Sequence, residues 1–211
     1  MEEQIMNMPA VALRGLTILP GMIAHFDISR ERSLRAVEEA MEQDQKIYLV
    51  TQRNVDSEDP TQEDLYQMGI VADIKQVVRL QNDVVRILVD GISRAALLGF
   101  TGNEKYLEAE ICYCDSNADS LPEDLREAML LGVREAFHRY AAVVGKISKE
   151  LIRQIDQYED LEKLIDYVTN NLPVSYELKQ QVLEAEDIND RYQVICLLYT
   201  SPSPRDPKTS R

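Results

Sequence analysis

The sequence predicts an α+β fold, in which a β-rich half that carries one helix is followed by a small all-helical bundle. Over the first 115 residues, apolar positions recur mostly with period two, which indicates strands. The composition changes at residues 115–120, DSNADS, and the apolar residues after this stretch recur at helical spacing. We therefore divide the chain into a β-rich subdomain, residues 1–115, a helical subdomain, residues 116–197, and a terminal segment, residues 198–211.

Residues 84–100, VVRILVDGISRAALLGF, are the stretch around which the predicted sheet is organised. Apolar residues alternate on both sides of Asp90-Gly91, and both faces of these strands are expected to be largely covered. Asp-Gly is a strong signal for a tight turn, because Gly adopts positive φ without a Cβ clash and Asp tolerates it. We therefore predict a β-hairpin, whose loop is either Asp90-Gly91 alone or a longer one that includes residues 92–94.

Local patterns predict the other elements of the β-rich half in order. Strands are expected at residues 8–14, 24–28, 46–51, 70–80 and 107–113. The run 46–51 is apolar on both sides and is predicted to be central, whereas 107–113 has one polar face. Residues 81–83, QND, predict a turn into the central hairpin. Residues 30–43 predict a helix, with one face formed by Leu34, Val37, Ala40 and Met41.

Five helices are predicted in the second half. A capping box at residues 120–123, SLPE, starts the first helix, and Ser148 caps the second. Apolar residues at helical spacing mark the others around residues 161–168, around 178–183 and from 188 onward. Residues 198–211, LYTSPSPRDPKTSR, contain three prolines within six residues, which cannot continue a helix. We expect this terminal segment to be non-native or disordered and exclude it from the predicted fold.

Composition and charge narrow the classes of function. With 211 residues, 45% of them hydrophobic, the chain can bury a sizeable core. Its net charge of −14 argues against nucleic acid as a partner, because such binding depends on Lys and Arg neutralising phosphates. No apolar run approaches the roughly 18 residues of a membrane span, and the acidic N-terminus does not resemble an export signal. The three cysteines form no even disulfide framework, so we expect a cytoplasmic protein.

We assign no motif in this sequence to catalysis or to a cofactor. Gly145-Lys146 is the nearest approach to a phosphate-binding loop, but the first Gly and the Ser or Thr of that motif are missing. Residues 91–95, GISRA, resemble a nucleophile elbow, which requires a turn between a strand and a helix rather than between two strands. We therefore expect this chain to hold no catalytic and no cofactor-binding residues.

The remaining chemically active side chains have structural or surface interpretations. His25 and His138 are far apart in the sequence, and neither has metal ligands at suitable spacing. Cys112 and Cys114 share one face of a predicted strand, and two ordinary thiols are favoured over a redox pair. The acidic residues 56–59, DSED, lack the spacing and the Gly of an EF-hand, so a solvated loop is favoured over a metal site.

The apolar loop at residues 18–22, ILPGM, is the candidate for binding another molecule. Pro20-Gly21 stops regular structure and leaves apolar side chains in a loop. These side chains either fold back onto the sheet as core or stay partly exposed and hold other chains, for which an adaptable Met is well suited. On the second alternative, the substrate-binding candidates are Leu19, Pro20 and Met22, with residues at the rim of the predicted hairpin.

Four stretches of the sequence carry a family resemblance when they are taken together. They are LRGLTILPGMIAHFDISRERSLRAVEEAM, IYLVTQ, VADIKQVVRLQNDVVRILVDGISRA and NNLPVSYELKQQVLE. In this order they closely resemble the N-terminal domain of bacterial Lon, the ATP-dependent serine protease. The resemblance runs from about residue 10 to residue 195, which is nearly the whole chain before the terminal segment.

The resemblance implies a PUA-like β-rich pseudobarrel followed by a helical subdomain, in agreement with the division above. In the family, this region recognises unfolded or damaged proteins, helps to gate their entry and supports a hexamer. The ATPase module, which uses ATP and Mg²⁺, and the Ser-Lys protease module lie farther along the family's chain. This chain alone is therefore expected not to be an enzyme, and to belong to a parent ATP-dependent serine endopeptidase.

Two interpretations of function follow. The first is the substrate-recognition and oligomer-supporting domain of a Lon-type protease, present here as a fragment, because the chain enters SPSPRD where the family continues into a long helix. The alternative is a free-standing Lon-like module that binds a small ligand or a regulatory protein, without ATPase or protease activity. The coding sequence beyond Cys196 distinguishes them, because a downstream phosphate-binding loop supports the first and a native stop codon the second.

Overall fold

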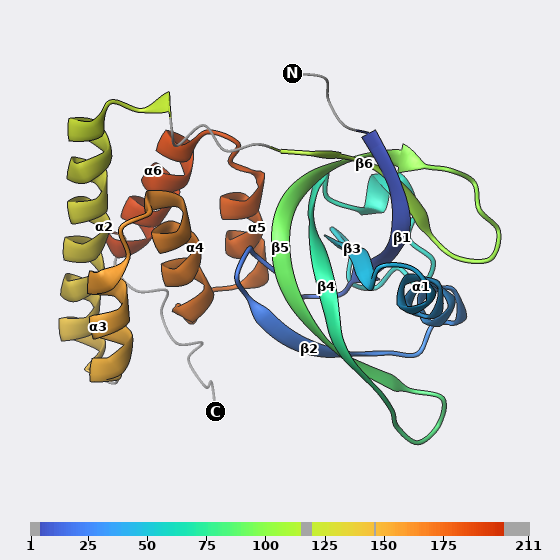
Figure 1. Ribbon diagram of the computed structural model, residues 1–211. Coiled ribbons are helices and arrows are strands. Elements are labelled where there is room, and N and C mark those ends of the chain that lie inside the picture. The colour runs from blue at the N-terminus through green and yellow to red at the C-terminus, as the bar shows by residue number, and fades with distance from the viewer. Residues whose placement is uncertain (1–4, 115–119, 146, 201–211) are drawn as a thin grey trace, which may run out of the picture.

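The computed structural model describes residues 5–114, 120–145 and 147–200, with side chains described as far as residue 197 (Figure 1). A β-barrel forms one side of the molecule and five helices form the other, which confirms the predicted α+β fold (Figure 1). The predicted boundary at residue 115 and residues 201–211 of the predicted terminal segment lie outside the described residues.

Six strands form one sheet that closes on itself. In chain order they are β1 (Ile5–Leu13), β2 (Ile23–Ile28), β3 (Lys46–Thr51), β4 (Met68–Arg79), β5 (Val85–Phe100) and β6 (Glu108–Tyr113). Their order in the sheet is β2-β5-β4-β3-β1-β6, and an additional pairing of β5 with β6 closes all but β2 into a ring. β1 and β3 are parallel, and the other pairs are antiparallel. β3 is buried between β4 and β1, which confirms its predicted central position.

The predicted β-hairpin at residues 84–100 is wrong, because these residues form one continuous strand, β5. The first half of β5 pairs with β2 and the second half with β6, while β4 runs alongside both halves. Next to Gly91 the register between β4 and β5 shifts, as at a β-bulge. The chain reversal occurs instead at residues 80–84, as predicted from Gln81-Asn82-Asp83, where Asn82 and Asp83 have positive φ.

Gly91 is needed for a close approach rather than for a turn. A Cβ atom at this position would lie 2.4 Å from the backbone oxygen of Leu19, in the loop between β1 and β2. The backbone of that loop is bonded to Gly91 on both sides, since Gly21 N donates to Gly91 O at 2.8 Å and Gly91 N donates to Met22 O at 3.0 Å. The Asp-Gly pair therefore makes room for the loop to lie against the middle of β5.

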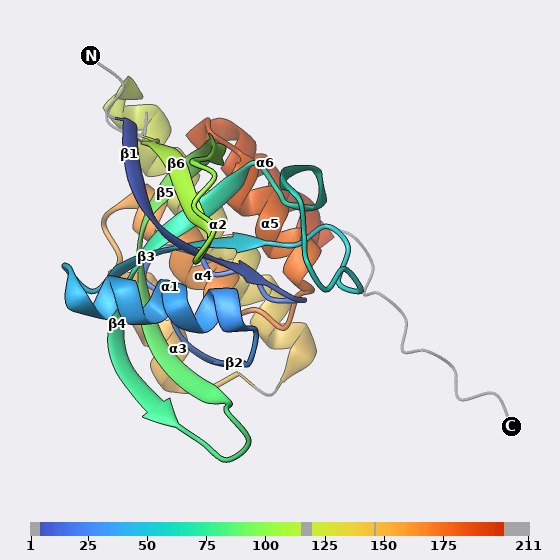
Figure 2. The ribbon, with the colours of Figure 1, turned by 90° about the vertical axis from the view of Figure 1, so that its right-hand side faces the viewer.

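Helix α1 (Glu31–Glu42) packs on β1 and β3 at one side of the barrel (Figure 2). The predicted apolar face is only partly correct, because Met41 is 39% exposed and Leu34 is half-buried. The buried residues are Ser33, Ala36, Val37 and Ala40. Two alanines four positions apart let the helix backbone lie close to the sheet, which turns the larger Met41 outward. A short 3₁₀ helix, η1 (Gln62–Asp64), lies in the connection between β3 and β4.

The helical subdomain consists of five helices with a common apolar core. They are α2 (Glu123–Val144), α3 (Lys149–Gln157), α4 (Leu161–Asn171), α5 (Tyr176–Glu184) and α6 (Ile188–Thr200). Phe137, Leu164 and Val168 are fully buried in this core. α5 lies next to the barrel and α2 lies farthest from it (Figure 1). None of the described helices combines the length and the apolar character that a membrane span requires.

The N-termini of α2 and α3 can be compared with the predicted helix caps. Ser148 caps α3 as predicted, because its hydroxyl accepts a hydrogen bond from Leu151 N at 3.2 Å. The capping box predicted at residues 120–123 is wrong, because the N-cap of α2 is Pro122, which has no side-chain acceptor. Pro122 has an extended ψ of 141°, so the helix begins only after it, at Glu123. At the other end of the subdomain, α6 includes the first three residues of the predicted terminal segment.

Candidate functional site

The apolar loop predicted as a binding element connects β1 to β2, and its first residues are core. Ile18 is 1% exposed and packs within the barrel, whereas Leu19 is completely buried in the core of the helical subdomain. Two consecutive residues of the loop therefore belong to different cores, Ile18 to that of the barrel and Leu19 to that of the helical subdomain. Of the three predicted substrate-binding residues, Leu19 is turned away from solvent, and Pro20 and Met22 are half-buried at the surface.

Hydrogen bonds fix this loop against both subdomains. On the helical side, Asn170 Nδ2 of α4 donates to Pro20 O at 3.2 Å. The hydroxyl of Thr17 is 3.2 Å from Gln180 Oε1 of α5, and Gln180 Nε2 donates to Met68 O of β4 at 2.9 Å. Since Gln180 and Thr17 are both buried, these bonds form in a place where water does not compete. The loop is thus anchored to α4 and α5 by side-chain hydrogen bonds.

Beyond the loop, exposed apolar side chains continue onto the adjacent strands. Ile23, at the start of β2, is 69% exposed, and Ile92 of β5 is 45% exposed. Ile23 pairs with Asp90 across the sheet, and Met22 O accepts from Gly91 N, so these residues are close neighbours. We call the set Pro20, Met22, Ile23 and Ile92 the apolar rim. Ile92 lies in the loop of the predicted hairpin, whose rim was among the binding candidates, whereas Ile23 was not a candidate. Each is next to a buried residue, Ala24 or Gly91, and so faces outward in the strand alternation.

A buried ion cluster fixes the helices beside the apolar rim. Arg94 of β5 forms two hydrogen bonds to the Asp166 carboxylate of α4, at 2.5 and 2.9 Å, and both side chains are at most 5% exposed. Glu162, which is 25% exposed, bridges Arg94 at 3.4 Å to Arg191 of α6. Burial raises the pKa of the Asp166 carboxyl above its ordinary value, and the charge of Arg94 opposes that rise. The cluster joins the middle of the barrel to two helices.

The other residues discussed from the sequence lie apart from one another. Ser93 is inside β5, not at a turn from strand to helix, so the elbow geometry is absent there. His138 Nε2 lies 2.8 Å from Asp156 Oδ1 on the exposed side of α2 and α3, and His25 lies on the exposed face of β2. No disulfide joins Cys112 to Cys114. In the described part of the chain, no group of three His, Cys, Asp or Glu side chains is placed to hold a metal ion.

Comparison with known families gives one match over nearly the whole chain. Residues 7–200 match the family described as the ATP-dependent protease La (LON) substrate-binding domain. The chain is 36% identical over 198 residues to the Lon protease of Lachnoclostridium phytofermentans, covering 94% of this chain and 24% of that protein. It is 32% identical over 190 residues to Lon protease 1 of Bacillus subtilis, covering 90% and 24%. The chain thus spans about a quarter of the length of these relatives.

Solved structures confirm the fold. The N-terminal domain of the Mycobacterium avium complex Lon protease superposes with a TM-score of 0.75 at 18% identity, covering 92% of this chain and 98% of that one. The Lon N-terminal domain protein from Xanthomonas campestris superposes with a TM-score of 0.62 at 14% identity, covering 93% and 99%. The barrel with its helical subdomain is therefore an arrangement shared with these domains.

Proposed function

This chain belongs to the family of Lon substrate-binding domains, and we propose that it binds unfolded or damaged proteins for degradation by an ATP-dependent protease. The chain matches only the substrate-binding part of its relatives, which fits a non-catalytic piece of a longer protein. We propose that ATP, Mg²⁺ and the protease chemistry belong to other parts of a parent protein that acts in the cytoplasm. The alternative of a free-standing binding module is not favoured, because the matched relatives are whole Lon proteases.

The observation that carries this proposal is the exposure of the apolar rim. Ile23 and Ile92 leave much of their apolar surface in water, although the chain has a large core in which such residues could be buried. A contiguous exposed apolar patch is typical of a site that binds protein. The backbone hydrogen bonds of Gly91 to Gly21 and Met22 hold the two strands of the apolar rim side by side. Unfolded chains differ from folded ones in exposing apolar side chains, so the apolar rim would select for them without requiring one sequence.

We propose that each copy binds weakly and that copies act together. Burying the remaining apolar surface of one Ile is worth roughly 1–2 kcal/mol, since complete burial is worth about 1.5–3 kcal/mol. A few such contacts give a modest affinity, which allows a substrate to be released toward the rest of the enzyme. In a hexameric parent, several copies facing one long unfolded chain would raise the effective concentration of binding sites and hence the avidity.

The proposal is tested with a permanently unfolded protein, reduced and carboxymethylated α-lactalbumin, labelled for fluorescence anisotropy. We expect Ile23→Ser and Ile92→Ser each to weaken binding about fivefold, and the double variant about twentyfold. Met22→Ser is expected to weaken binding less, because Met22 is already half-buried.

Leu80→Ser is the matched control, because Leu80 is 40% exposed but lies at the turn between β4 and β5. This control should bind unfolded α-lactalbumin as tightly as the unsubstituted chain does, and folded α-lactalbumin should not bind at all. If the unsubstituted chain, the double variant and the control all bound unfolded α-lactalbumin with equal affinity, the apolar rim would not be the binding surface.

A further inference from the structure

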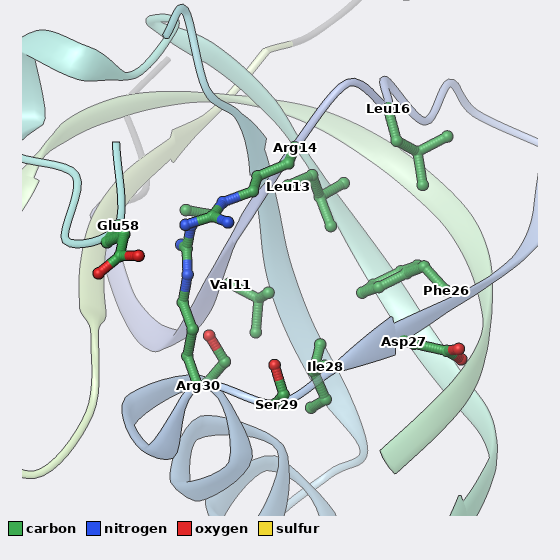
Figure 3. Close-up of a pocket in the computed structure, with 12 residues that line it drawn as sticks. Val11, Leu13, Arg14, Leu16, Phe26, Asp27, Ile28, Ser29, Arg30 and Glu58 are labelled. Atoms are coloured by element: carbon green, nitrogen blue, oxygen red, sulfur yellow. The ribbon is translucent and has the colours of Figure 1, made fainter. Parts of the chain in front are cut away.

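A pocket of about 460 Å³ opens on the barrel, and no residue of the apolar rim lines it. It lies where β1 ends, β2 ends and α1 begins, and the loop at residues 52–60 borders it. Two arginines, Arg14 and Arg30, form one side of the pocket, and Phe26 lies at the opposite side (Figure 3). A cationic end and an apolar end are thus combined in one cavity.

The two arginines are held beside each other by a common acceptor. Arg14 Nη2 donates to Ser57 O at 2.9 Å, and Arg30 Nη2 donates to the same oxygen at 3.1 Å. Arg30 also donates to Gln52 Oε1 at 2.9 Å, and this completely buried amide in turn donates to Ser57 O at 3.0 Å. Partial burial and the neighbouring charge of Arg14 lower the pKa of Arg30. The structure therefore maintains two like charges side by side, an arrangement that an anion between them would stabilise.

The nearby carboxylates Asp59 and Glu58 offset the charge of this pair only in part. Among the described residues, none forms a salt bridge within 4.0 Å of Arg14 or Arg30, although the chain has 37 acidic against 23 basic residues. Arg32, two positions after Arg30, does pair with Asp59 at 3.5 Å. Each guanidinium of the pair uses its Nη2 group toward Ser57, which leaves other N–H donors of the planar fork for a ligand.

The charges around the pocket favour a ligand with a single negative charge. Glu58, which also lines the pocket, lies beside the arginines on the loop and offsets part of their charge (Figure 3). Asp27, at the other end, is already neutralised by two hydrogen bonds from Arg86, at 2.7 and 2.8 Å, and the pKa of its carboxyl is lowered by them. Asp59 also acts on Arg30, but its charge is balanced by its ion pair with Arg32, so only Glu58 is counted against the two arginines. About one positive charge is left in excess, which matches a carboxylate better than a phosphate dianion.

The apolar end of the pocket indicates what should accompany the carboxylate. Leu16 and Phe26 are half-buried, so each still offers apolar surface to a ligand, and Ile28 also lines the pocket. Figure 3 shows Val11 and Ile28 between the arginines and Phe26. A ligand that places a carboxylate on the arginines can therefore place an adjacent apolar side chain on this wall.

We propose that this pocket binds a peptide carboxylate with an apolar side chain next to it, as a second contact for substrates separate from the apolar rim. The inference rests on the proposed function in taking the ligand to be a peptide. The carboxylate comes either from the C-terminus of the peptide or from an internal Asp or Glu, and the two sources share the same chemistry at the arginines.

The test uses three fluorescein-labelled octapeptides, each titrated against the whole chain at 150 mM NaCl. The first ends in Leu-Phe with a free carboxylate, the second is the same peptide amidated, and the third is amidated with Glu before the Leu. We expect the unsubstituted chain to bind the first peptide, the free acid, about tenfold more tightly than the second, its amide. If the third peptide binds like the free acid, internal carboxylates are also accepted, and if it binds like the amide, the pocket is specific for the C-terminus. Equal binding of all three peptides would overturn the proposal.

Substitutions of single residues test whether the carboxylate binds at the two arginines. Arg14→Gln and Arg30→Gln should each reduce the affinity for the free acid to that for the amide, and Arg14 is exposed, so its replacement leaves the fold intact. Arg79→Gln is the matched control, because it removes the same charge from an arginine that is 81% exposed on β4. Glu58→Gln should tighten binding of the free acid two- to threefold, an effect that a merely structural role of the arginines would not produce. If Arg79→Gln weakened binding of the free acid as much as Arg14→Gln, the affinity would depend on the net charge of the chain rather than on the pocket. That result would overturn the proposal.

Two further measurements separate this proposal from the proposed function. Inorganic phosphate at 10 mM should compete less well than acetate, and the reverse order would refute the choice of a carboxylate. If unfolded α-lactalbumin binds and no peptide does, the pocket proposal fails and the proposed function stands. If the free acid binds through Arg14 while unfolded α-lactalbumin does not bind, the pocket proposal stands and the proposed function fails.

Discussion

Replacing Asp166 by Asn is expected to lower the free energy of unfolding by about 3 kcal/mol. The carboxylate of Asp166 holds Arg94 through two hydrogen bonds in a site where both side chains are almost inaccessible to water. Removal of one partner of a buried ion pair leaves the other charge uncompensated, which costs about 3–5 kcal/mol. Asn keeps the shape and one acceptor oxygen, and Glu162 remains 3.4 Å from Arg94, so the lower end of that range applies.

Thermal denaturation followed by circular dichroism measures this effect. For a chain of about 200 residues, 1 kcal/mol corresponds to a change in Tm of about 2–4 °C, so Asp166→Asn should lower Tm by about 6–12 °C. Glu162→Gln is the control within the same cluster, and it should lower Tm by only about 2–4 °C because water reaches this side chain.

The double variant Arg94→Met with Asp166→Leu should recover most of the lost stability, because it removes both charges and keeps the volume. If the Tm of Asp166→Asn were within 2 °C of that of the unsubstituted chain, the reasoning would be refuted. Such a result would mean that Arg94 becomes hydrated or forms an ion pair with another residue. A double variant less stable than Asp166→Asn would also contradict it, since the pair would then contribute more than compensation of charge.

Three further predictions concern single residues. Gly91→Ala should lower the free energy of unfolding by about 1–3 kcal/mol, because its Cβ meets the backbone of Leu19, whereas Gly99→Ala meets only an ordinary contact at 3.9 Å and should have little effect in the same melting experiment. Ser148→Ala should cost about 1 kcal/mol through loss of the α3 cap, measured by urea denaturation, and an unchanged midpoint would show that the cap is not formed in solution. Cys114 should react with iodoacetamide at pH 8.5 more slowly than N-acetylcysteine, because burial raises the pKa of its thiol and lowers the thiolate fraction; mass spectrometry showing an equal or faster rate would contradict this.

Periodicity in the sequence predicted most of the fold, because buried strands and amphipathic helices carry their own pattern. Residues 46–51 became the central strand β3 as predicted, and the helix expected at residues 30–43 became α1. The error at Asp90-Gly91 has a specific cause. Local turn propensity was outweighed by the pairing of residues 85–96 of β5 with β4, which continues through Asp90-Gly91. This pairing depends on contacts between segments that are separate in the sequence, so the local pattern does not predict it.

The candidate site was less predictable, because it depends on how distant segments meet. The burial of Leu19 is decided by helices more than a hundred residues later in the chain, so the sequence left both alternatives open for the apolar loop. Arg14 and Arg30 stood in the stretch that carried the family resemblance, but only the position of Ser57 shows that they form a pair. Strand alternation could have identified Ile23 as an outward-facing residue, since Ala24 beside it is buried.

Closure of the barrel has a consequence for how this chain is made. The ring depends on β1 pairing with β6, Ile5 opposite Cys112, so it cannot close before the ribosome has released residues up to Tyr113. Until then, β1 can pair with β3 on one edge only, and its other edge carries unpaired N–H and C=O groups. At about 5–20 residues per second of synthesis, that interval lasts several seconds. The domain that we propose captures unfolded chains therefore presents an open strand edge of its own while it emerges from the ribosome.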